Sequence, residues 1–236
     1  MSTLFEAWNE LSTEGTKACE GAIDEQETSI VGQFANEQLL ALVQRLFLAG
    51  WPRSMRQVVF AGTSEDAGSA GICRLVAETL AEQSRARICL LETDPRIEEA
   101  EMNLEDEREQ GGKTEGRRIE ATGAIHLRRN LQLLPASVWK GPQGSLTLPW
   151  IRRRLGELRS DFEYAVIHAA PLGVCSETET LARLTDGIVL VVEAHRTRRV
   201  QARMMQQKLR ATGVQVLGAI LSGRTFPIPE RIYRRF

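Results

Sequence analysis

A glycine-rich loop between an apolar strand and an apolar-faced helix is the feature that most constrains this 236-residue chain. Residues 57–60 form an apolar run, residues 61–71 read AGTSEDAGSAG, residues 72–82 carry apolar side chains at helical spacing, and residues 88–91 form a second apolar run. In such a unit, backbone N–H groups and a helix N-terminus point at an anion. The loop therefore predicts a phosphate-cradling site, but it lacks the Gly-Lys-Ser/Thr that ends the usual motif.

The rest of the chain alternates short apolar strands with helices. Helices are expected over residues 37–49, 148–159, 178–184 and 200–211, and further strands over 130–135, 164–170, 187–192 and 216–221. Short, nearly continuous apolar strands are typical of a parallel sheet covered on both faces. The sequence thus predicts an α/β fold with a mainly parallel sheet in a three-layer α/β/α arrangement. In the helix over 148–159, the four arginines are expected to face solvent: Arg152, Arg153, Arg154 and Arg159.

Three parts are expected along the chain. Residues 36–223 form the α/β domain, residues 1–35 hold a short amphipathic helix and a flexible linker, and residues 224–236 form a tail with prolines, aromatic residues and arginines. The tail either packs back on the domain or presents Tyr233 outward. The Gly-Gly-Lys-Thr stretch at 111–114 lacks a preceding strand and is expected to be a solvated loop.

Composition limits the classes of partner and compartment. Thirty basic and 31 acidic residues give a net charge of −1, so global charge gives no reason to expect nucleic acid or a membrane surface as a partner. The N-terminal residues lack the pattern of a signal peptide, and the longest apolar run, 188–192, is too short to span a bilayer. A cytoplasmic protein is expected. The four cysteines are scattered and are expected to be reduced thiols: Cys19, Cys73, Cys89 and Cys175.

The order of the short motifs resembles the cytoplasmic domain of bacterial tyrosine autokinases of capsule and exopolysaccharide synthesis, relatives of the MinD and ParA ATPases. The resemblance covers residues 36–223 and rests on EDAGSAG followed by ICRLVAETLA, then ICLLETDPR, LLPAS, EYAVIHAAP, TDGIVLVV and LGAILSG. It implies a P-loop NTPase-like fold, with ATP and Mg²⁺ as the cofactors that an active member would bind. The charged positions of the family motifs agree poorly with this chain.

In the phosphate loop, the resemblance matches Gly68 to the glycine before the Walker lysine. Ser69 then stands at the lysine position and Ala70 at that of the magnesium-binding hydroxyl, while Gly62 lies one residue further away than in the standard motif. Choosing Gly71 as the matching glycine instead restores no lysine. Together with Arg96 these residues form a vestigial phosphate loop and its flank.

In the two later motifs, Glu92 replaces the first aspartate, Asp94 and Arg96 match, and His168 replaces the Walker B aspartate. Neutral imidazole is a poor ligand for Mg²⁺, which prefers oxygen. Glu92 could act as a general base and Asp94 as a metal ligand, or Asp94 and Arg96 could be an inherited surface pair that caps the next turn. His168 either contacts a partner or responds to pH, or it is a strand-end imidazole bonded to a loop carbonyl.

Other candidates are weaker. Arg196, Arg198 and Arg199 form a basic cluster that either binds phosphate or an acidic partner or is a solvated helix start. His126 and His195 have no neighbours at metal-ligand spacing and receive no role.

Phosphoryl transfer depends on positioning and on cations that neutralise charge, so these replacements together oppose catalysis. The leading hypothesis is a pseudo-kinase or pseudo-ATPase that acts as a regulatory or scaffolding protein of exopolysaccharide synthesis and export. The resemblance implies a membrane chain-length regulator or another export protein as partner, reached through the helix over 37–49, and implies self-association. The protein would then lie peripherally at the inner membrane. Tyr164 and Tyr233 are the only tyrosines, so the family's C-terminal tyrosine cluster is nearly absent.

Two alternatives remain open. One is an active ATP-dependent tyrosine kinase or ATPase with an unusual site, in which Arg96 or a lysine from a neighbouring subunit replaces the loop lysine. The other is a MinD/ParA-like positioning factor, although such proteins usually carry an additional loop lysine and a membrane or DNA handle.

Overall fold

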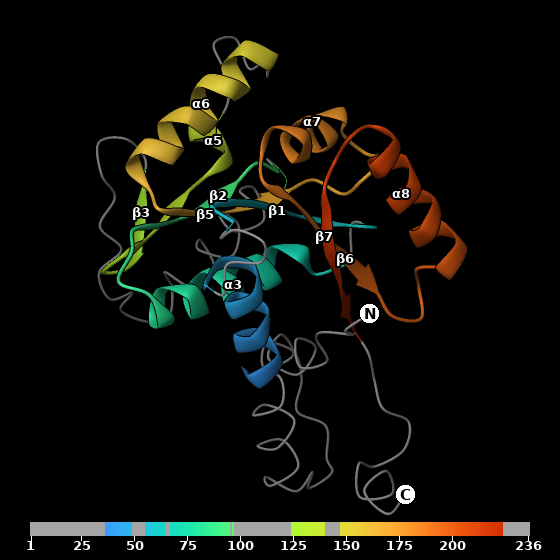
Figure 1. Ribbon diagram of the computed structural model, residues 1–236, viewed down its shortest axis with the longest axis horizontal. Coiled ribbons are helices and arrows are strands. Elements are labelled where there is room, and N and C mark those ends of the chain that lie inside the picture. Colours follow the sequence, from blue (N-terminus) through green and yellow to red (C-terminus); the bar gives the residue numbers. More distant parts are fainter. Residues whose placement is uncertain are drawn as a thin grey trace, which may run out of the picture.

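The computed structural model describes residues 36–48, 55–64, 67–94, 96, 124–139 and 147–223. The expected segments 1–35 and 224–236 lie outside these residues, as do Cys19, the Gly-Gly-Lys-Thr stretch at 111–114 and Tyr233. The described residues build one sheet with helices on both of its faces (Figure 1).

The elements follow one another much as the apolar pattern predicts. A helix over 36–43 continues into the π-helical turn η1 (Gln44–Leu48), followed by β1 (Gln57–Gly62), α3 (Ser69–Gln83) and β2 (Ile88–Glu92). The remaining elements are β3 (Ile125–Arg128), β4 (Leu131–Leu134), α5 (Ala136–Trp139), α6 (Leu148–Asp161), β5 (Tyr164–Ala169), α7 (Ser176–Leu184), β6 (Gly187–Glu193), α8 (Arg199–Ala211) and β7 (Val216–Ser222).

The sheet has seven strands in the order β3-β4-β2-β5-β1-β6-β7. Every neighbouring pair is parallel except β3 and β4, which are antiparallel. This arrangement confirms the predicted α/β class and the mainly parallel sheet. The sequence missed β3, because an edge strand with half-exposed residues shows little apolar alternation, and it missed the four-residue helix α5.

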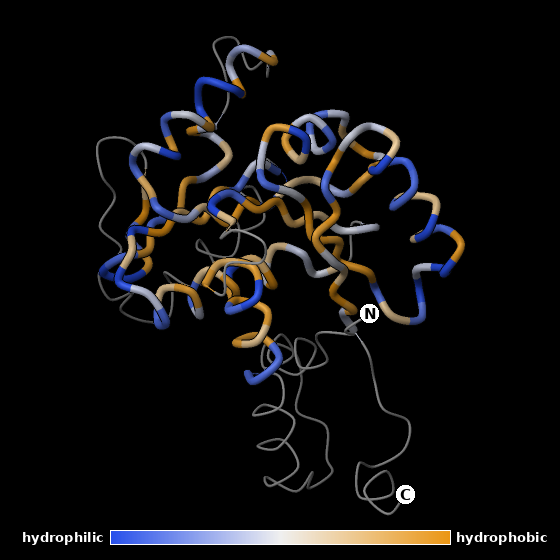
Figure 2. The backbone as a smooth tube through the Cα atoms, in the orientation of Figure 1, coloured by the Kyte–Doolittle hydropathy of each residue, from blue (hydrophilic) through white to orange (hydrophobic). Residues whose placement is uncertain are grey.

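The strands are buried on both faces, and their alternating side chains build two cores. Val58 and Phe60 of β1 face the core formed with α3 and the helix over 36–48. Val59 and Ala61 face the core formed with α5, α6, α7 and α8. The hydropathy colouring shows the central strands as a continuous apolar layer between helices whose outer sides are polar (Figure 2).

Two polar side chains bind backbone groups at the amino ends of the strands. The carboxylate of Asp186 accepts backbone N–H groups of Arg56 and Gln57, at 2.7 and 2.8 Å. The side-chain amide of Asn130 donates to the carbonyl oxygens of Ala81, Ser84 and Ala86, at 3.2, 2.8 and 3.1 Å. These bonds satisfy backbone groups that helix and strand ends leave without regular partners.

The expected exposure of the α6 arginines is wrong for Arg154. Its side chain is only 23% exposed, and it donates to Glu157 Oε2 at 2.7 Å and to the Val138 carbonyl at 3.3 Å. The short helix α5 that the sequence missed supplies this carbonyl and covers the arginine. Arg152, Arg153 and Arg159 are exposed, as expected.

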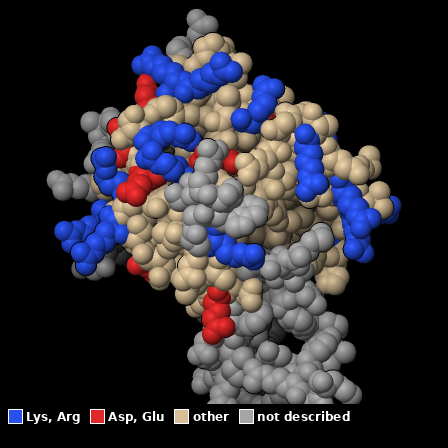
Figure 3. Space-filling view, viewed as in Figure 1, with Lys and Arg blue, Asp and Glu red and all other residues tan. Residues whose placement is uncertain are grey.

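The outer helix α8 buries little of itself. Within α8, Leu209 is the one buried residue, whereas the side chains of Val200 and Met204 are 69% and 64% exposed. Basic side chains gather over α6 and α8 on the face shown in Figure 3. Among the described residues, none of the helices has both the length and the apolar character that a membrane crossing requires.

Two glycines give opposite predictions for the same substitution. Gly187 begins β6 with φ of 151°, and a Cβ added there would stand 2.6 Å from the Gln215 carbonyl oxygen. Gly156 lies on the exposed side of α6, and a Cβ added there would meet nothing within 4 Å. We expect Gly187→Ala to lower the free energy of unfolding by about 1–3 kcal/mol. Gly156→Ala should raise it by about 0.5–1 kcal/mol. Urea denaturation measures both, and equal effects of the two substitutions would contradict the packing described.

Candidate functional site

The candidate site lies where three parallel strands end. The carboxyl ends of β1, β2 and β5 are adjacent in the sheet, and the loop after β1 leads into the N-terminus of α3. Open parallel sheets bind ligands at this edge. The predicted loop, strand-end and flanking residues are all found there: Gly62, Gly68, Ser69, Ala70, Gly71, Glu92, Asp94, Arg96 and His168.

The loop is closely fitted to the chain around it. Gly62 ends β1, and a Cβ there would stand 2.6 Å from the Ser64 carbonyl oxygen and 3.5 Å from Ser69 Oγ. Gly68 is the N-cap residue of α3 with φ of 65°, a left-handed conformation that glycine adopts without strain. Ser69, Ala70 and Gly71 form the first turn of α3, and Ser69 is only 6% exposed.

Further hydrogen bonds fix the loop to the ends of β6 and β7. Thr63 Oγ1 lies 2.9 Å from Thr197 Oγ1, and Ser64 Oγ donates to Glu193 Oε2 at 3.2 Å. The buried Ser222 hydroxyl donates to the Ala67 carbonyl at 2.9 Å. The described loop residues are therefore attached to the side of the site where β6 and β7 lie.

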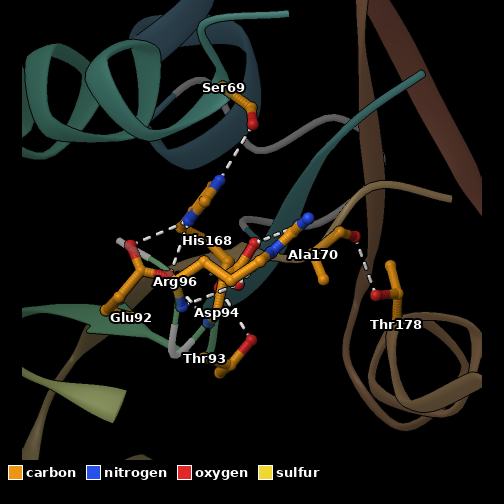
Figure 4. Close-up of polar contacts among 8 residues, drawn as sticks. All are labelled: Ser69, Glu92, Thr93, Asp94, Arg96, His168, Ala170 and Thr178. Atoms are coloured by element: carbon orange, nitrogen blue, oxygen red, sulfur yellow. Dashed lines mark hydrogen bonds and ion pairs between the residues drawn. The ribbon is translucent and has the colours of Figure 1, made fainter. Parts of the chain in front are cut away.

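A chain of three buried side chains crosses the site (Figure 4). Ser69 Oγ lies 2.8 Å from His168 Nε2, and His168 Nδ1 lies 2.6 and 2.8 Å from the two oxygens of Glu92. Glu92 Oε1 also accepts the backbone N–H of Asp94, at 2.8 Å. His168 is 2% exposed and Glu92 is 8% exposed.

The pleat of the sheet explains why these residues meet. Glu92 and His168 are register partners on β2 and β5, so their side chains point to the same face. That face is the one covered by α3, where Ser69 begins the helix. The sequence analysis missed the contact, although the alternation Ile88, Leu90, Glu92 and Tyr164, Val166, His168 could have indicated it.

The expected bond from His168 to a loop carbonyl is wrong. Both ring nitrogens instead contact side chains, because the imidazole lies between β2 and α3 rather than over the loop after β5. The backbone carbonyl of His168 accepts the hydroxyl and the N–H of Thr93, at 2.8 and 3.1 Å. The strand end is thus held by both its backbone and its side chain.

Asp94 and Arg96 form a pair beside this chain of bonds. Arg96 donates its backbone N–H and Nε to Asp94 Oδ1 at 3.1 and 2.9 Å, and Nη2 to Oδ2 at 2.7 Å. The pair caps the turn after β2 as one of the two expectations had it, but it is no surface pair, since Asp94 is 3% exposed. Burial alone would raise the pKa of Asp94, but the hydrogen bonds and charge of Arg96 hold this pKa below its usual value.

Thiols near the site are unreactive in character. Burial, followed by the negative charge of Glu92, raises the pKa of the Cys73 thiol well above its ordinary value. Burial likewise raises the pKa of Cys89, on β2. Both residues are free cysteines, as expected, and pack as small apolar side chains.

The remaining candidates lie away from this site or on its rim. His126 contacts Gln132 on the edge strands at 3.4 Å, and Arg196 pairs with Glu193 at 3.5 Å. A concave region near the amino ends of the strands, opposite the candidate site, is lined by residues that include Arg87, Asn130 and Arg154. Among the described residues, no three His, Cys, Asp or Glu side chains are grouped to hold a metal ion.

The Asp94–Arg96 pair predicts a pH-dependent contribution to stability. The folded pKa of Asp94 lies below the unfolded value, so the stabilisation is present above about pH 4 and is lost as the pH falls through the folded pKa. We expect Arg96→Gln to lower the urea midpoint at about pH 6 and to approach the wild type in strong acid.

The control is Arg74→Gln, which removes an exposed pair with Glu78 on α3 and should change the midpoint little at either pH. An equal loss for Arg96→Gln at both pH values would show that the pair does not set the pKa of Asp94.

Part of the chain is similar in sequence to known proteins. No protein-family model matches it. The chain is 26% identical over 93 residues to a tyrosine-protein kinase, CpsD, of Streptococcus agalactiae, which amounts to 39% of this chain and 41% of that protein. The matching region thus spans about two fifths of the length of this curated relative.

Solved structures share the fold over most of the chain. The kinase domain of the Escherichia coli tyrosine kinase ETK is 15% identical, with a TM-score of 0.63 over 96% of this chain and 91% of that one. The VpsO kinase domain is 19% identical, with a TM-score of 0.59 over 83% and 99%. A putative plasmid partition protein of Borrelia burgdorferi bound to AMPPNP is 14% identical, with a TM-score of 0.53 over 77% and 81%. The chain therefore resembles bacterial tyrosine-protein kinases in sequence and shares the P-loop fold of their kinase domains and of a partition protein.

Proposed function

We propose that this chain is a tyrosine-kinase-like P-loop domain that has lost phosphoryl transfer and acts as a regulatory or scaffolding subunit of exopolysaccharide synthesis and export. The observation that carries this proposal is the chain of bonds from Ser69 through His168 to Glu92. In the family register, Ser69 stands at the lysine position and His168 at the Walker B aspartate. Ser69 and His168 thus occupy positions that would contact nucleotide and metal in an active member of the family, and here their side chains bond to each other.

The residues present fit Mg²⁺-nucleotide poorly. The loop over residues 61–71 contains no Lys or Arg to follow the transferred phosphate, and Ala70 offers no hydroxyl. The Ser69 hydroxyl is directed to His168, and an imidazole prefers softer metals than Mg²⁺. Glu92 binds His168 and the Asp94 N–H, so its oxygens are already engaged. Several replacements therefore oppose nucleotide binding at one place.

An active kinase or ATPase with an unusual site would need another cation. Arg96 is the candidate within the chain, but its backbone N–H and two of its guanidinium N–H groups are bonded to Asp94. Using Arg96 for phosphate would leave Asp94, which is 3% exposed, without its charged partner. The structure of the partition protein with AMPPNP keeps a nucleotide-binding role open to the fold, so nucleotide titration is the deciding experiment.

The outer side of the first helix is available for a partner. Leu39, Val43 and Phe47 are buried against the sheet, whereas Glu37 and Ala41 are exposed. We place the contact with a membrane chain-length regulator, or with a second copy of the chain, on this exposed side. The domain would then lie at the cytoplasmic side of the inner membrane through its partner.

The first prediction concerns nucleotide. Titration calorimetry of ATP and ADP, with and without Mg²⁺, should show no binding tighter than a Kd of about 1 mM, because the site lacks its cations. A matched variant, Ser69→Lys with Ala70→Ser and His168→Asp, restores the family residues at three positions and should gain Mg²⁺-dependent binding. Micromolar, Mg²⁺-dependent binding by the unchanged protein would sink the proposal and favour an active enzyme.

The second prediction concerns the partner. In a bacterial two-hybrid assay with the chain-length regulator of the same organism, the unchanged protein should give a signal that Ala41→Arg abolishes, because the new side chain disrupts the proposed contact. Gln207→Arg adds the same charge on α8, far along the chain from the first helix, and should leave the signal intact. Absence of a signal from the unchanged protein, or equal signals from both variants, would refute this docking site.

A further inference from the structure

The three-residue chain at the site has the geometry of a charge-relay triad. A carboxylate accepts hydrogen bonds and donates none, so the close contact of His168 Nδ1 with Glu92 places the ring proton on Nδ1. When the ring is neutral, Nε2 is then the acceptor, and the Ser69 hydroxyl, 2.8 Å away, is its donor. The Asp94 N–H holds the Glu92 carboxylate in turn. A nucleophile, a base and a group that orients the base therefore stand in line (Figure 4).

The position of Ser69 suits a nucleophile. It is the first residue of α3 and directly follows Gly68, which has a left-handed conformation, so it lies at the N-terminus of the helix. The first N–H groups of a helix lack acceptors within it, and in α3 the Ile72 N–H donates to the Gly68 carbonyl at 3.2 Å. The N–H groups of Ala70 and Gly71 can therefore stabilise a negative oxygen near Ser69, helped by the helix dipole.

Close packing limits what can reach the hydroxyl. Ser69 is 6% exposed, and a Cβ at Gly62 would stand 3.5 Å from Ser69 Oγ but only 2.6 Å from the Ser64 carbonyl oxygen and 3.0 Å from the Ala67 Cβ. Gly68 and Ala70 flank the serine along the chain. Such a site admits a short acyl group better than a bulky one.

We propose that Ser69 is a nucleophile toward esters of short carboxylic acids. Ser69 Oγ forms a bond with the acyl carbon while its proton passes to His168 Nε2, and the carbonyl oxygen becomes an oxyanion. The tetrahedral intermediate expels the alcohol, which takes the proton from His168, and leaves an acyl-serine. Water, deprotonated by His168, then releases the carboxylic acid and restores Ser69. Glu92 is a positioning residue, and this activity is separate from the regulatory role and from nucleotide binding.

The test uses the purified full chain with p-nitrophenyl acetate and with a fluorophosphonate. Release of p-nitrophenol should be about 100-fold faster for the unchanged protein than for Ser69→Ala, in line with the contribution of a general base. Peptide mass spectrometry should place the fluorophosphonate adduct on Ser69. Ser160→Ala, which removes an exposed serine hydroxyl on α6 outside the candidate site, should react like the unchanged protein.

Three further variants test the triad without relying on Ser69→Ala. Glu92→Gln should lower kcat while leaving KM and the far-UV circular dichroism unchanged, and Glu92→Asp should restore part of kcat. Ser69→Cys should be alkylated by iodoacetamide faster than the buried Cys73 and Cys89. Equal rates for the unchanged protein and Ser69→Ala, with no adduct at Ser69, would overturn the inference whatever the nucleotide titration shows.

Discussion

Burial of the strands on both faces is the constraint on which the rest of the structure depends. A strand such as β1 sends alternate side chains into two separate cores, so every residue from Gln57 to Gly62 is buried. No polar side chain can remain on such a strand without a partner. Gln57 donates to the Leu155 carbonyl at 2.8 Å, and His168 contacts Ser69 and Glu92. The same rule that forms the sheet thus brings the site residues together.

The pairing of His168 and Glu92 follows from this rule and changes the nature of the site. A carboxylate at the end of one strand and an imidazole at the end of the next are register partners on the α3 face. Each would be costly to bury alone, and together they satisfy one another. The two side chains are thus mutually adapted in structure.

Much of the fold could be predicted from sequence because it depends on apolar periodicity. The strands β1, β2, β5 and β6 are continuous apolar runs, and α3 carries its apolar residues at helical spacing. β3 was not predicted, because an edge strand buries little of its surface and its sequence therefore lacks a continuous apolar run. The contacts of the site were not predicted, since they depend on strand order and register, which place residues 76 positions apart within 2.6 Å. The expected exposure of Arg154 failed for a similar reason, because α5 comes from a separate part of the chain.

The chain of bonds from Ser69 to Glu92 also couples the effects of substitutions at these positions. A lysine at residue 69 would place a cationic group against the His168 ring, and an aspartate at residue 168 would put a second carboxylate beside that of Glu92. A change at one position therefore alters the partner of the next side chain. The free-energy effects of substitutions at residues 69, 92 and 168 are thus coupled and do not add.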